Sequence, residues 1–322
     1  MHAIQIASTG GPEVLDFVDI PAPEVFPGHL LVEVEAAGLN YIDTYHRRGL
    51  YPVELPLVPG MEGAGTVTAV GPGAEGISVG DRVAWTDVLG SYAEIVSVPA
   101  DRAVQVPDDI DSSTAAAVML QGITAHYLAR STYSLAAGER CLIHAGAGGV
   151  GRLLIQMAKS LGAVVFTTVG SPEKVEVASS AGADYVIDYR HSSFDDQIRE
   201  IAGERPFDVV YDGVGAATFA QGLELLRPRG MMVTFGNASG PVEPVAPLEL
   251  TRQGSLYLTR PTLGHYIADH AELVRRANDL FEWIGAGRLE VLVGATYPLA
   301  DAARAHRALE GRATIGKTLL VP

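Results

Sequence analysis

The sequence predicts an α/β protein in which a strand-rich part precedes a doubly wound parallel sheet. Two features of the 322-residue chain lead to this prediction. Up to about residue 115, short alternating or β-branched stretches are separated by glycine and proline, which is typical of an antiparallel, barrel-like unit. From residue 141 onward, apolar stretches bounded by glycine alternate with amphipathic ones, which is typical of parallel strands joined by helices.

The expected elements follow from these patterns in chain order. The strands of the first part cover residues 30–39, 64–71, 79–85 and 91–99. The strands of the middle part cover residues 141–145, 163–169, 185–188, 207–212, 231–236 and 255–259, with helices between them at residues 150–161, 172–181, 194–202 and 216–226. This alternation is the one expected of a dinucleotide-binding domain.

The last part of the chain shows a third pattern of residues. Residues 272–292 indicate a helix that stops at a glycine and is followed by a strand, residues 301–311 a second helix, and residues 317–322 a closing strand. We expect this tail to pack back onto the first part. The dinucleotide-binding domain would then be inserted in the chain.

Composition excludes several classes of partner. The formal net charge is −15, so binding to a nucleic acid or to an anionic membrane is not expected. The single cysteine, Cys141, allows no disulfide within the chain and lies in an apolar strand pattern, where an inert thiol is expected. The chain shows neither an apolar stretch of about 18 residues nor a leader pattern, so we expect a cytoplasmic protein.

The segment CLIHAGAGGVG, residues 141–151, carries the pattern G-x-G-x-x-G at Gly146, Gly148 and Gly151. The pattern follows an apolar strand and opens a helix, which is the context in which it binds a pyrophosphate. Glycine allows a tight turn and a close approach of the phosphates, and the start of the helix offers free N–H groups. A glycine-rich turn without a ligand is the alternative, and the strands that follow count against it.

The end of the second strand of this domain indicates which cofactor binds. An NAD site usually has a carboxylate there, about 20 residues after the glycines, that binds the ribose 2′-hydroxyl. This chain has Gly170, Ser171 and Lys174 at that place, and Tyr189 and Arg190 follow the third strand. A hydroxyl group and cations suit a 2′-phosphate, so we predict NADPH rather than NADH. For Lys174 and Arg190 the alternative is ordinary solvated charge.

The glycine pattern belongs to a longer resemblance. The stretch GERCLIHAGAGGVGRLLIQMAK, residues 138–159, resembles the signature of the quinone oxidoreductase and zeta-crystallin group of the medium-chain dehydrogenase/reductase superfamily. The stretches AGLNYIDTYHRRGLY, PGMEGAGTV, VVYDGVG and RATIGKTLLVP are similar to the same family, and the resemblance spans essentially the whole chain.

The resemblance implies an architecture and an assembly. It implies a GroES-like catalytic domain made of residues 1–120 and 264–322, a Rossmann domain made of residues 121–263, and a cofactor cleft between them. It also implies a homodimer formed through the sheet edges, near residues 255–259. An exposed edge strand is a natural place for such pairing.

The same resemblance implies roles for individual residues. Asn40, Tyr45 and Tyr51 are expected to be catalytic, at the nicotinamide and substrate end. The expected cofactor-binding residues are Asn40, Thr124, Gly146, Gly148, Gly149, Val150, Gly151, Gly170, Ser171, Lys174, Tyr189, Phe235, Gly236 and Asn237. Asn40 and Asp43 have the alternative of capping or turning the chain after a strand, and the two tyrosines have that of packing.

The zinc alcohol dehydrogenases of the same superfamily are the nearest rival. Their catalytic zinc takes ligands at positions that correspond here to Asn40, Met61 and Gln121, none of which is a good zinc ligand. Glu62 remains and cannot hold a catalytic zinc alone. We therefore expect no metal, and an acceptor that is electrophilic without one.

These features predict an NADPH-dependent, zinc-independent quinone reductase. Hydride addition to a quinone yields a stable aromatic hydroquinone anion, and holding NADPH and quinone face to face would supply most of the catalysis. A reductase of α,β-unsaturated carbonyls is an alternative that uses the same residues. A nucleotide-binding protein without catalysis is an alternative of a different class.

Overall fold

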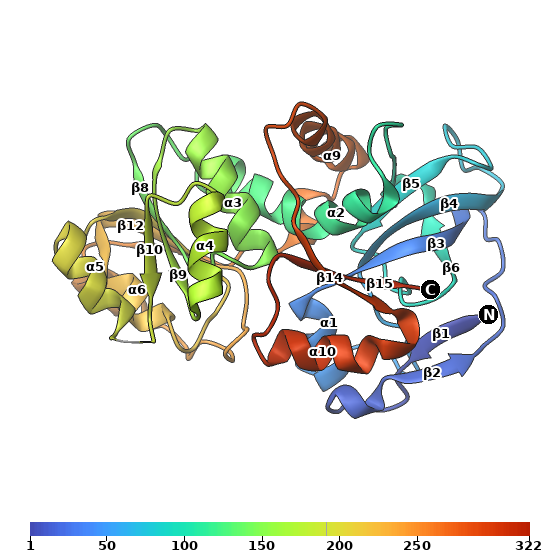
Figure 1. The fold of residues 1–322 in the computed structure, drawn as a ribbon, viewed down its shortest axis with the longest axis horizontal. Coiled ribbons are helices and arrows are strands. Elements are labelled where there is room, and N and C mark those ends of the chain that lie inside the picture. The colour runs from blue at the N-terminus through green and yellow to red at the C-terminus, as the bar shows by residue number, and fades with distance from the viewer. Residues whose placement is uncertain (191) are drawn as a thin grey trace. The chain divides into compact units, whose positions relative to one another are not determined.

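The computed structural model describes residues 1–190 and 192–322, and the chain divides into two compact units (Figure 1). Unit 1 consists of Met1–Ile123 and Tyr266–Pro322, and unit 2 of Thr124–His265. The first boundary falls within helix α2 (Ser112–Tyr127) and the second within helix α8 (Leu263–Tyr266). Unit 2 is therefore inserted into the chain of unit 1.

Unit 2 is built on a six-stranded sheet. Its strand order is β10-β9-β8-β11-β12-β13, and every neighbouring pair is parallel. The strands are β8 (Arg140–Ile143), β9 (Val164–Val169), β10 (Tyr185–Asp188), β11 (Phe207–Asp212), β12 (Leu226–Thr234) and β13 (Tyr257–Thr259). The order reverses between β8 and β11, which is the switch point where such sheets bind ligands.

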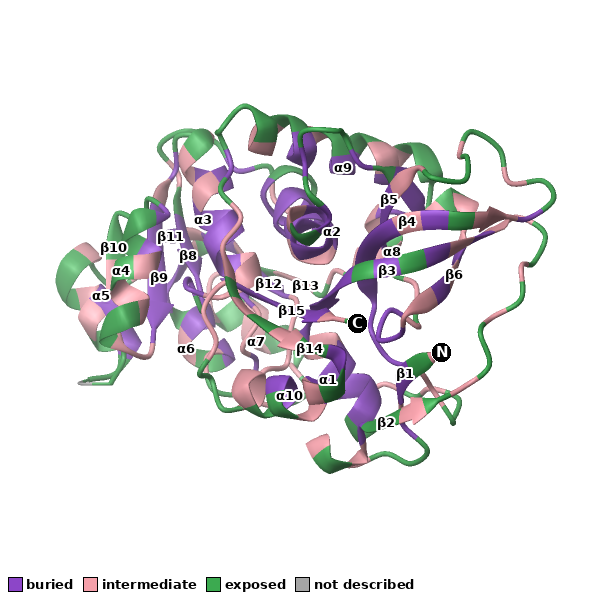
Figure 2. Ribbon diagram, turned by 45° about the vertical axis from the view of Figure 1, so that its right-hand side comes forward, coloured by how far each residue is buried: buried purple, intermediate pink, exposed green. Residues whose placement is uncertain are grey.

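Helices cover both faces of this sheet (Figure 1). Helices α3 (Gly149–Ser160) and α4 (Pro172–Ser180) lie on one face, and α5 (Phe194–Ala202) and α6 (Phe219–Glu224) on the other. A short helix α7 (Pro247–Arg252) precedes β13. Because both faces are covered, the central strands are almost wholly buried (Figure 2), as parallel strands usually are. The predicted doubly wound fold is confirmed.

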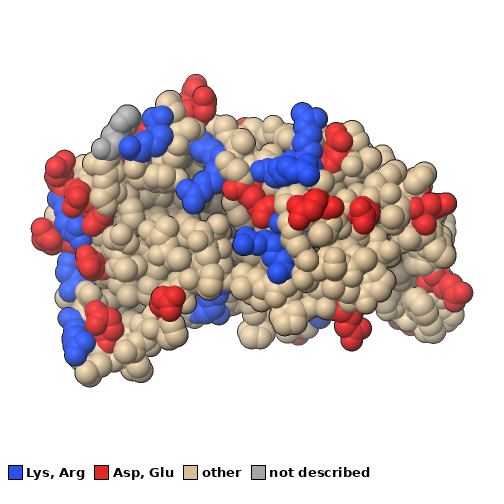
Figure 3. All heavy atoms as spheres, turned by 90° about the horizontal axis from the view of Figure 1, so that it is seen from below, with Lys and Arg blue, Asp and Glu red and all other residues tan. Residues whose placement is uncertain are grey.

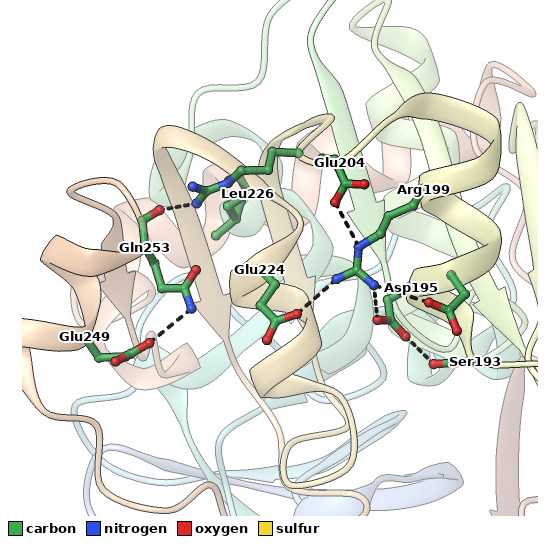
Figure 4. A network of polar contacts seen from close by, with 10 residues as sticks. Ser193, Asp195, Arg199, Glu204, Glu224, Leu226, Glu249 and Gln253 are labelled. Carbon is green, nitrogen blue, oxygen red and sulfur yellow. Dashed lines mark hydrogen bonds and ion pairs between the residues drawn. The ribbon is translucent and has the colours of Figure 1, made fainter.

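A charged network ties together the two helices on one face of unit 2 (Figure 4). The guanidinium of Arg199 on α5 pairs with Asp195 (2.5 Å) on the same helix and with Glu224 (3.0 Å) at the end of α6. Glu204 adds a longer contact of 3.5 Å. Asp195 is buried, but Glu204 and Glu224 are exposed, so their ion pairs with Arg199 add little to stability.

Unit 1 contains a mixed sheet and a small hairpin. The sheet order is β14-β15-β3-β4-β5-β7, with β6 paired to β3, and β1 pairs with β2. The strands are β1 (His2–Gln5), β2 (Asp16–Asp19), β3 (His29–Leu39), β4 (Glu62–Val70), β5 (Arg82–Thr86), β6 (Ile95–Pro99), β7 (Ala103–Gln105), β14 (Val293–Pro298) and β15 (Lys317–Val321). Pairing of β15 with β3 brings the last residues of the chain beside its first long strand.

The strand pairs within the first part of the chain are antiparallel, as predicted, and the tail adds a parallel pair. Strands β14 and β15 are parallel, because helix α10 (Ala302–Glu310) forms the crossover between them. The strand expected within residues 272–292 begins only at Val293, after helix α9 (His270–Gly285). Two helices were not predicted at all in the strand-rich part. They are α1 (Tyr41–Arg48) and the first half of α2.

Candidate functional site

The glycine pattern forms the turn between β8 and α3. Ala145 has a positive φ of 58°, and the turn is closed by a hydrogen bond from the Gly148 backbone N–H to the Ala145 carbonyl (2.9 Å). A Cβ at Gly146 would lie 2.1 Å from Thr167 Oγ1 on β9, and one at Gly151 would lie 2.3 Å from the Ala145 carbonyl oxygen. These two glycines are needed so that the turn can pack against β9 and α3 against the turn.

The start of α3 has the features of an anion site. A Cβ at Gly148 would meet only the Ala145 carbonyl oxygen, at 3.2 Å, and Gly148, Gly149 and Val150 are all partly exposed. The N–H groups of a first helical turn have no partner within the helix, and the helix dipole favours negative charge beside them. The residues present therefore fit a pyrophosphate at this helix end.

The predicted 2′-phosphate residues come together beyond the end of β9. Gly170 follows the strand and Ser171 is the N-cap of α4. A Cβ at Gly170 would lie 2.5 Å from the Tyr189 hydroxyl, so the tyrosine ring lies against this glycine. Lys174, in the first turn of α4, is partly exposed. The Ser171 hydroxyl donates to Glu173 (3.2 Å), which sequence reasoning did not consider.

Arg190 takes the alternative role that the sequence left open. Its guanidinium pairs with Asp188 (2.5 Å), two residues earlier, and its backbone N–H donates to the same carboxylate (3.1 Å). The arginine side chain is 38% exposed. In this structure it is therefore part of a surface ion pair.

Residues 235–237 follow β12, next to the end of β11. The Phe235 backbone N–H donates to the Asp212 carbonyl (2.8 Å), and a Cβ at Gly236 would lie 2.3 Å from the Gly213 carbonyl oxygen. The Arg260 guanidinium donates to the Gly236 carbonyl (3.0 Å). Arg260, which lies just after β13, was not singled out from the sequence.

The residues predicted in unit 1 start at helix α1. Asn40 is the N-cap of this helix, and its backbone N–H donates to the Asp43 carboxylate (2.8 Å). The capping alternative for these two residues is thus confirmed. Tyr45 and Tyr51 pack edge to face, with their ring centroids 5.2 Å apart; Tyr45 is buried and Tyr51 partly exposed. Thr124, on α2 at the first residue of unit 2, is buried.

A cluster of buried polar groups surrounds Asn40. The Glu62 carboxylate, at the start of β4, has no exposed surface. Its Oε1 accepts hydrogen bonds from Asn40 Nδ2 (2.7 Å) and from the Lys317 ammonium, and its Oε2 accepts from the Leu120 backbone N–H (2.6 Å). A Cβ at Gly38 would lie 2.2 Å from Glu62 Oε1, so only glycine leaves room for the carboxylate. A lysine of the same unit thus pairs with this buried acid.

Lys317 and Gln121 complete the cluster at the Asn40 carbonyl. Asn40 Oδ1 accepts from Lys317 Nζ (2.9 Å) and from Gln121 Nε2 (3.0 Å). Burial lowers the pKa of the Lys317 ammonium to about 7, and the negative charge of Asp43 opposes this shift. Lys317 was not singled out from the sequence. The available signal was a charged residue that opens an otherwise apolar closing strand.

A second buried chain of polar groups runs from Asp43 toward α10. The Tyr92 hydroxyl donates to Asp43 Oδ2 (2.9 Å) and contacts His306 Nε2 (3.3 Å). The Arg47 guanidinium donates to His306 Nδ1 (2.9 Å), so the imidazole is neutral and carries its proton on Nε2. The other end of Arg47 pairs with Glu310 (2.8 Å). None of these contacts was predicted.

The pKa values of Asp43 and His306, at the two ends of this series of buried polar groups, are shifted in opposite directions. Burial, opposed by the hydrogen bonds from the Asn40 N–H and Tyr92, raises the pKa of Asp43 to about 6. Burial and the positive charge of Arg47 lower the pKa of His306 to about 3. Asp43 is thus within reach of protonation near neutral pH, and His306 is not.

Other expectations from the sequence concern the single cysteine, metals, membranes and charge. Cys141 is buried, and burial raises the pKa of its thiol, as expected of an inert cysteine. Within residues 1–190 and 192–322, no three His, Cys, Asp or Glu side chains are grouped so that they could hold a metal ion. In the same ranges, no helix is long and apolar enough to cross a membrane. On the face drawn in Figure 3, basic and acidic side chains are interspersed among large uncharged areas.

Comparison with known proteins places this arrangement in a class. Residues 26–108 match the family described as alcohol dehydrogenase GroES-like domain, and residues 149–279 match the family described as zinc-binding dehydrogenase. A GroES-like unit with an inserted doubly wound unit and a glycine turn after its first strand defines the medium-chain dehydrogenase/reductase superfamily.

Within this superfamily, several of the similar proteins are quinone oxidoreductases. The chain is 46% identical to a quinone oxidoreductase of Pseudomonas aeruginosa, with 99% of each chain covered. A solved structure of Escherichia coli quinone oxidoreductase complexed with NADPH is 44% identical, with a TM-score of 0.97 and 100% of each chain covered. A 2-haloacrylate reductase of Burkholderia is 39% identical, over 99% of this chain and 98% of that protein. The chain belongs to the quinone oxidoreductase family of medium-chain dehydrogenase/reductases.

Proposed function

We propose that this protein is an NADPH-dependent quinone reductase that works without zinc. The similarity to quinone oxidoreductases along the full chain supports the activity, and the NADPH in the Escherichia coli structure supports the cofactor. The observation that carries the zinc-independent part is the buried Lys317–Glu62 pair beside Asn40.

The cofactor part of the proposal uses unit 2. NADPH would supply the hydride, the start of α3 would hold its pyrophosphate, and residues 235–237 would border its nicotinamide ribose. At the end of β9, Gly170 and Ser171 stand where an NAD site has a carboxylate, and Lys174 is partly exposed. The ammonium of Lys174 would pair with the 2′-phosphate through a charge-assisted hydrogen bond.

The absence of zinc from the mechanism follows from the donor atoms near Glu62. An amide, a thioether and an amide stand at Asn40, Met61 and Gln121, and zinc in proteins prefers thiolate, imidazole and carboxylate. The one carboxylate, Glu62, is already paired with the Lys317 ammonium and bonded to Asn40 and a backbone N–H. A divalent cation would have to compete with a built-in positive charge.

The choice of acceptor follows from the same cluster. Without a Lewis acid, an alcohol or a simple ketone is not polarised enough to exchange a hydride readily. A quinone is electrophilic by itself, and its reduction yields an aromatic anion. Tyr51, which is partly exposed and packs edge to face on the buried Tyr45, would contribute to the aromatic, largely apolar lining that such an acceptor needs.

An activated alkene is the second candidate acceptor. The specific observation in its favour is the 39% identity to a 2-haloacrylate reductase over nearly the full length of both proteins. The double bond of such a substrate is polarised by its own carbonyl group, so the same metal-free site would serve. Both candidates share the cofactor and differ in the acceptor.

We also propose that the protein is a homodimer that uses the outer edge of β13. This strand ends the six-stranded sheet of unit 2, and Tyr257 on it is 59% exposed. Unpaired strand edges favour association with a second chain. Light scattering on the purified protein tests this, and a monomer at micromolar concentration would reject it.

The experiment that tests the activity compares acceptors and cofactors in one assay. Oxidation of NADPH would be followed with 1,4-benzoquinone, with 2-hexenal and without acceptor, and then repeated with NADH. Fast turnover with NADPH and quinone supports the proposal. Turnover with the enal alone would move the function to alkene reduction, and no turnover with either acceptor would reject both candidates.

A further inference from the structure

The amide groups around Asn40 have orientations that the structure determines without ambiguity. Asn40 Nδ2 faces the Gly38 carbonyl (3.2 Å) and Glu62 Oε1 (2.7 Å), which both accept hydrogen bonds. Asn40 Oδ1 faces the Lys317 ammonium, which only donates. Both hydrogens of the Asn40 amide and both acceptor positions of its oxygen are therefore used inside the protein.

The orientation of Asn40 fixes that of Gln121. Because Asn40 presents its carbonyl oxygen, Gln121 must present its N–H group, and its Nε2 lies 3.0 Å from Asn40 Oδ1. The Gln121 carbonyl is therefore turned away from the cluster. Within the part of the chain that the structure describes, this buried oxygen accepts no hydrogen bond. An acceptor left unpaired in a buried place is costly, unless a water molecule or a ligand supplies the donor.

We propose that Gln121 is a ligand-binding residue whose Oε1 accepts a hydrogen bond from an N–H or O–H group on a bound ring. This inference rests on the proposed function, which provides two such rings. The reduced nicotinamide carries a carboxamide N–H, and the hydroquinone product carries an O–H. The quinone itself is excluded as the partner of this oxygen, because its carbonyl groups only accept hydrogen bonds.

The rest of the cluster then has a positioning role. Lys317 and Glu62 hold the Asn40 amide in one orientation. Because the Asn40 oxygen then faces Gln121, it selects the orientation in which Gln121 donates its N–H group. Asn40 itself has no donor or acceptor left for a ligand, so Gln121 is the side chain of this cluster that meets it. Gln121 is partly exposed, whereas Asn40 and Lys317 are almost completely buried. This difference agrees with a ligand-binding role for Gln121 and a positioning role for the other two.

A comparison of two cofactors tests the inference. In the 3-acetylpyridine analogue of NADPH, a methyl ketone replaces the carboxamide, so the N–H donor is lost. Calorimetric titration should show that the wild-type protein binds NADPH about tenfold more tightly than this analogue, the ratio expected for one hydrogen bond. In Gln121→Met the ratio of the two dissociation constants should fall to about one, because the acceptor is gone.

A matched control and a second ligand complete the test. Gln221→Met makes the same change on α6 of unit 2 and should keep the wild-type ratio, and thermal unfolding should show that both variants are folded. If the ratio is unchanged in Gln121→Met but inhibition by hydroquinone weakens about tenfold, the donor is the product hydroxyl and the inference holds. If neither changes, the inference is overturned. Turnover of NADPH and quinone by the wild-type protein tests the proposed function separately.

Discussion

The buried chain from Asp43 through Tyr92 to His306 predicts an unusual dependence of stability on pH. Asp43 and His306, the two ends of this series of polar groups, change the free energy of unfolding in the same pH range but in opposite directions. In the wild-type protein these effects nearly cancel, so replacing either end should reveal the other. Asp43→Asn and His306→Gln are suitable changes, because both keep a group that can bond to Tyr92.

The expected size of each effect follows from the pKa values. The unfolded imidazole of His306 binds a proton below pH 6.5, but the folded one does so only near pH 3. Stability is therefore lost as the pH falls through this window, by about 2 kcal/mol at pH 5. The folded carboxyl of Asp43 binds a proton near pH 6, but the unfolded one only near 3.8. Lowering the pH from 7 to 5 therefore stabilises the fold by about 1.4 kcal/mol.

The variants should respond to acid in opposite directions. Between pH 7 and 5 the wild-type free energy of unfolding should change by less than about 1 kcal/mol from this pair. In Asp43→Asn only His306 of this pair titrates, so the contribution of the pair to stability should fall by about 2 kcal/mol. In His306→Gln only Asp43 of this pair titrates, so the contribution of the pair should rise by about 1.4 kcal/mol.

Tryptophan fluorescence during urea unfolding provides the assay. Both tryptophans of the chain, Trp85 and Trp283, belong to unit 1, so their signal follows the unit that contains the buried chain. Asp16→Asn, on exposed strand β2, serves as the control and should match the wild-type pH response. If Asp43→Asn and His306→Gln respond to pH in the same direction, the assignment of a neutral His306 and a high-pKa Asp43 is wrong.

Four further predictions concern the cofactor and the buried pair. Lys174→Ala should raise the KM for NADPH at least about tenfold and leave that for NADH unchanged, as kinetics with both cofactors will show. Gly151→Ala should lower the melting temperature and weaken NADPH binding, measured by fluorescence, because its Cβ would lie 2.3 Å from the Ala145 carbonyl oxygen. Lys317→Met should cost about 3–5 kcal/mol in urea unfolding, since Glu62 loses its counter-ion, and adding Glu62→Gln should restore most of this. Dialysis against a chelator should leave quinone reduction unchanged, and metal analysis should find no stoichiometric zinc.

The parallel sheet was predictable because its signals are local. Strands that are buried on both faces read as continuous apolar runs, and the helices between them show one apolar face. The predicted strands 185–188 and 207–212 and the predicted helix 194–202 agree with β10, β11 and α5 residue for residue. The glycine turn was equally accessible, because its conformation depends on residues within one short segment.

The helices of unit 1 were missed for two different reasons. Helix α2 contains the run from Ala115 to Met119, in which every residue is fully buried, so no polar face marks a helical period. Helix α1 has only eight residues, and five of them are aromatic, β-branched or histidine. Its one clear signal was the pair Asn40 and Asp43 at its start, which was noted as a possible cap.

The buried polar cluster could not be predicted from the sequence for a further reason. Asn40 and Lys317 lie 277 residues apart in the sequence, and Tyr92 and His306 lie 214 apart. Only the pairing of β15 with β3, and the packing that follows from it, brings these groups together. Sequence reasoning found the positions where a zinc ligand was missing, but it had no means of finding the lysine that lies beside them.

That lysine also limits what the cluster can do chemically. A zinc ion in an open site keeps one coordination position for the substrate, and through it polarises a carbonyl group. The Lys317 ammonium is almost completely buried and directs its hydrogens to Glu62 and Asn40, so its charge is used to neutralise a carboxylate and to orient an amide. The group of the cluster that is left to bind a ligand in our proposal is the neutral carbonyl of Gln121, which would hold and orient a ring but could not activate it. Reduction in such a site would have to draw on the electrophilicity of the acceptor itself, which is the property that quinones and activated alkenes share.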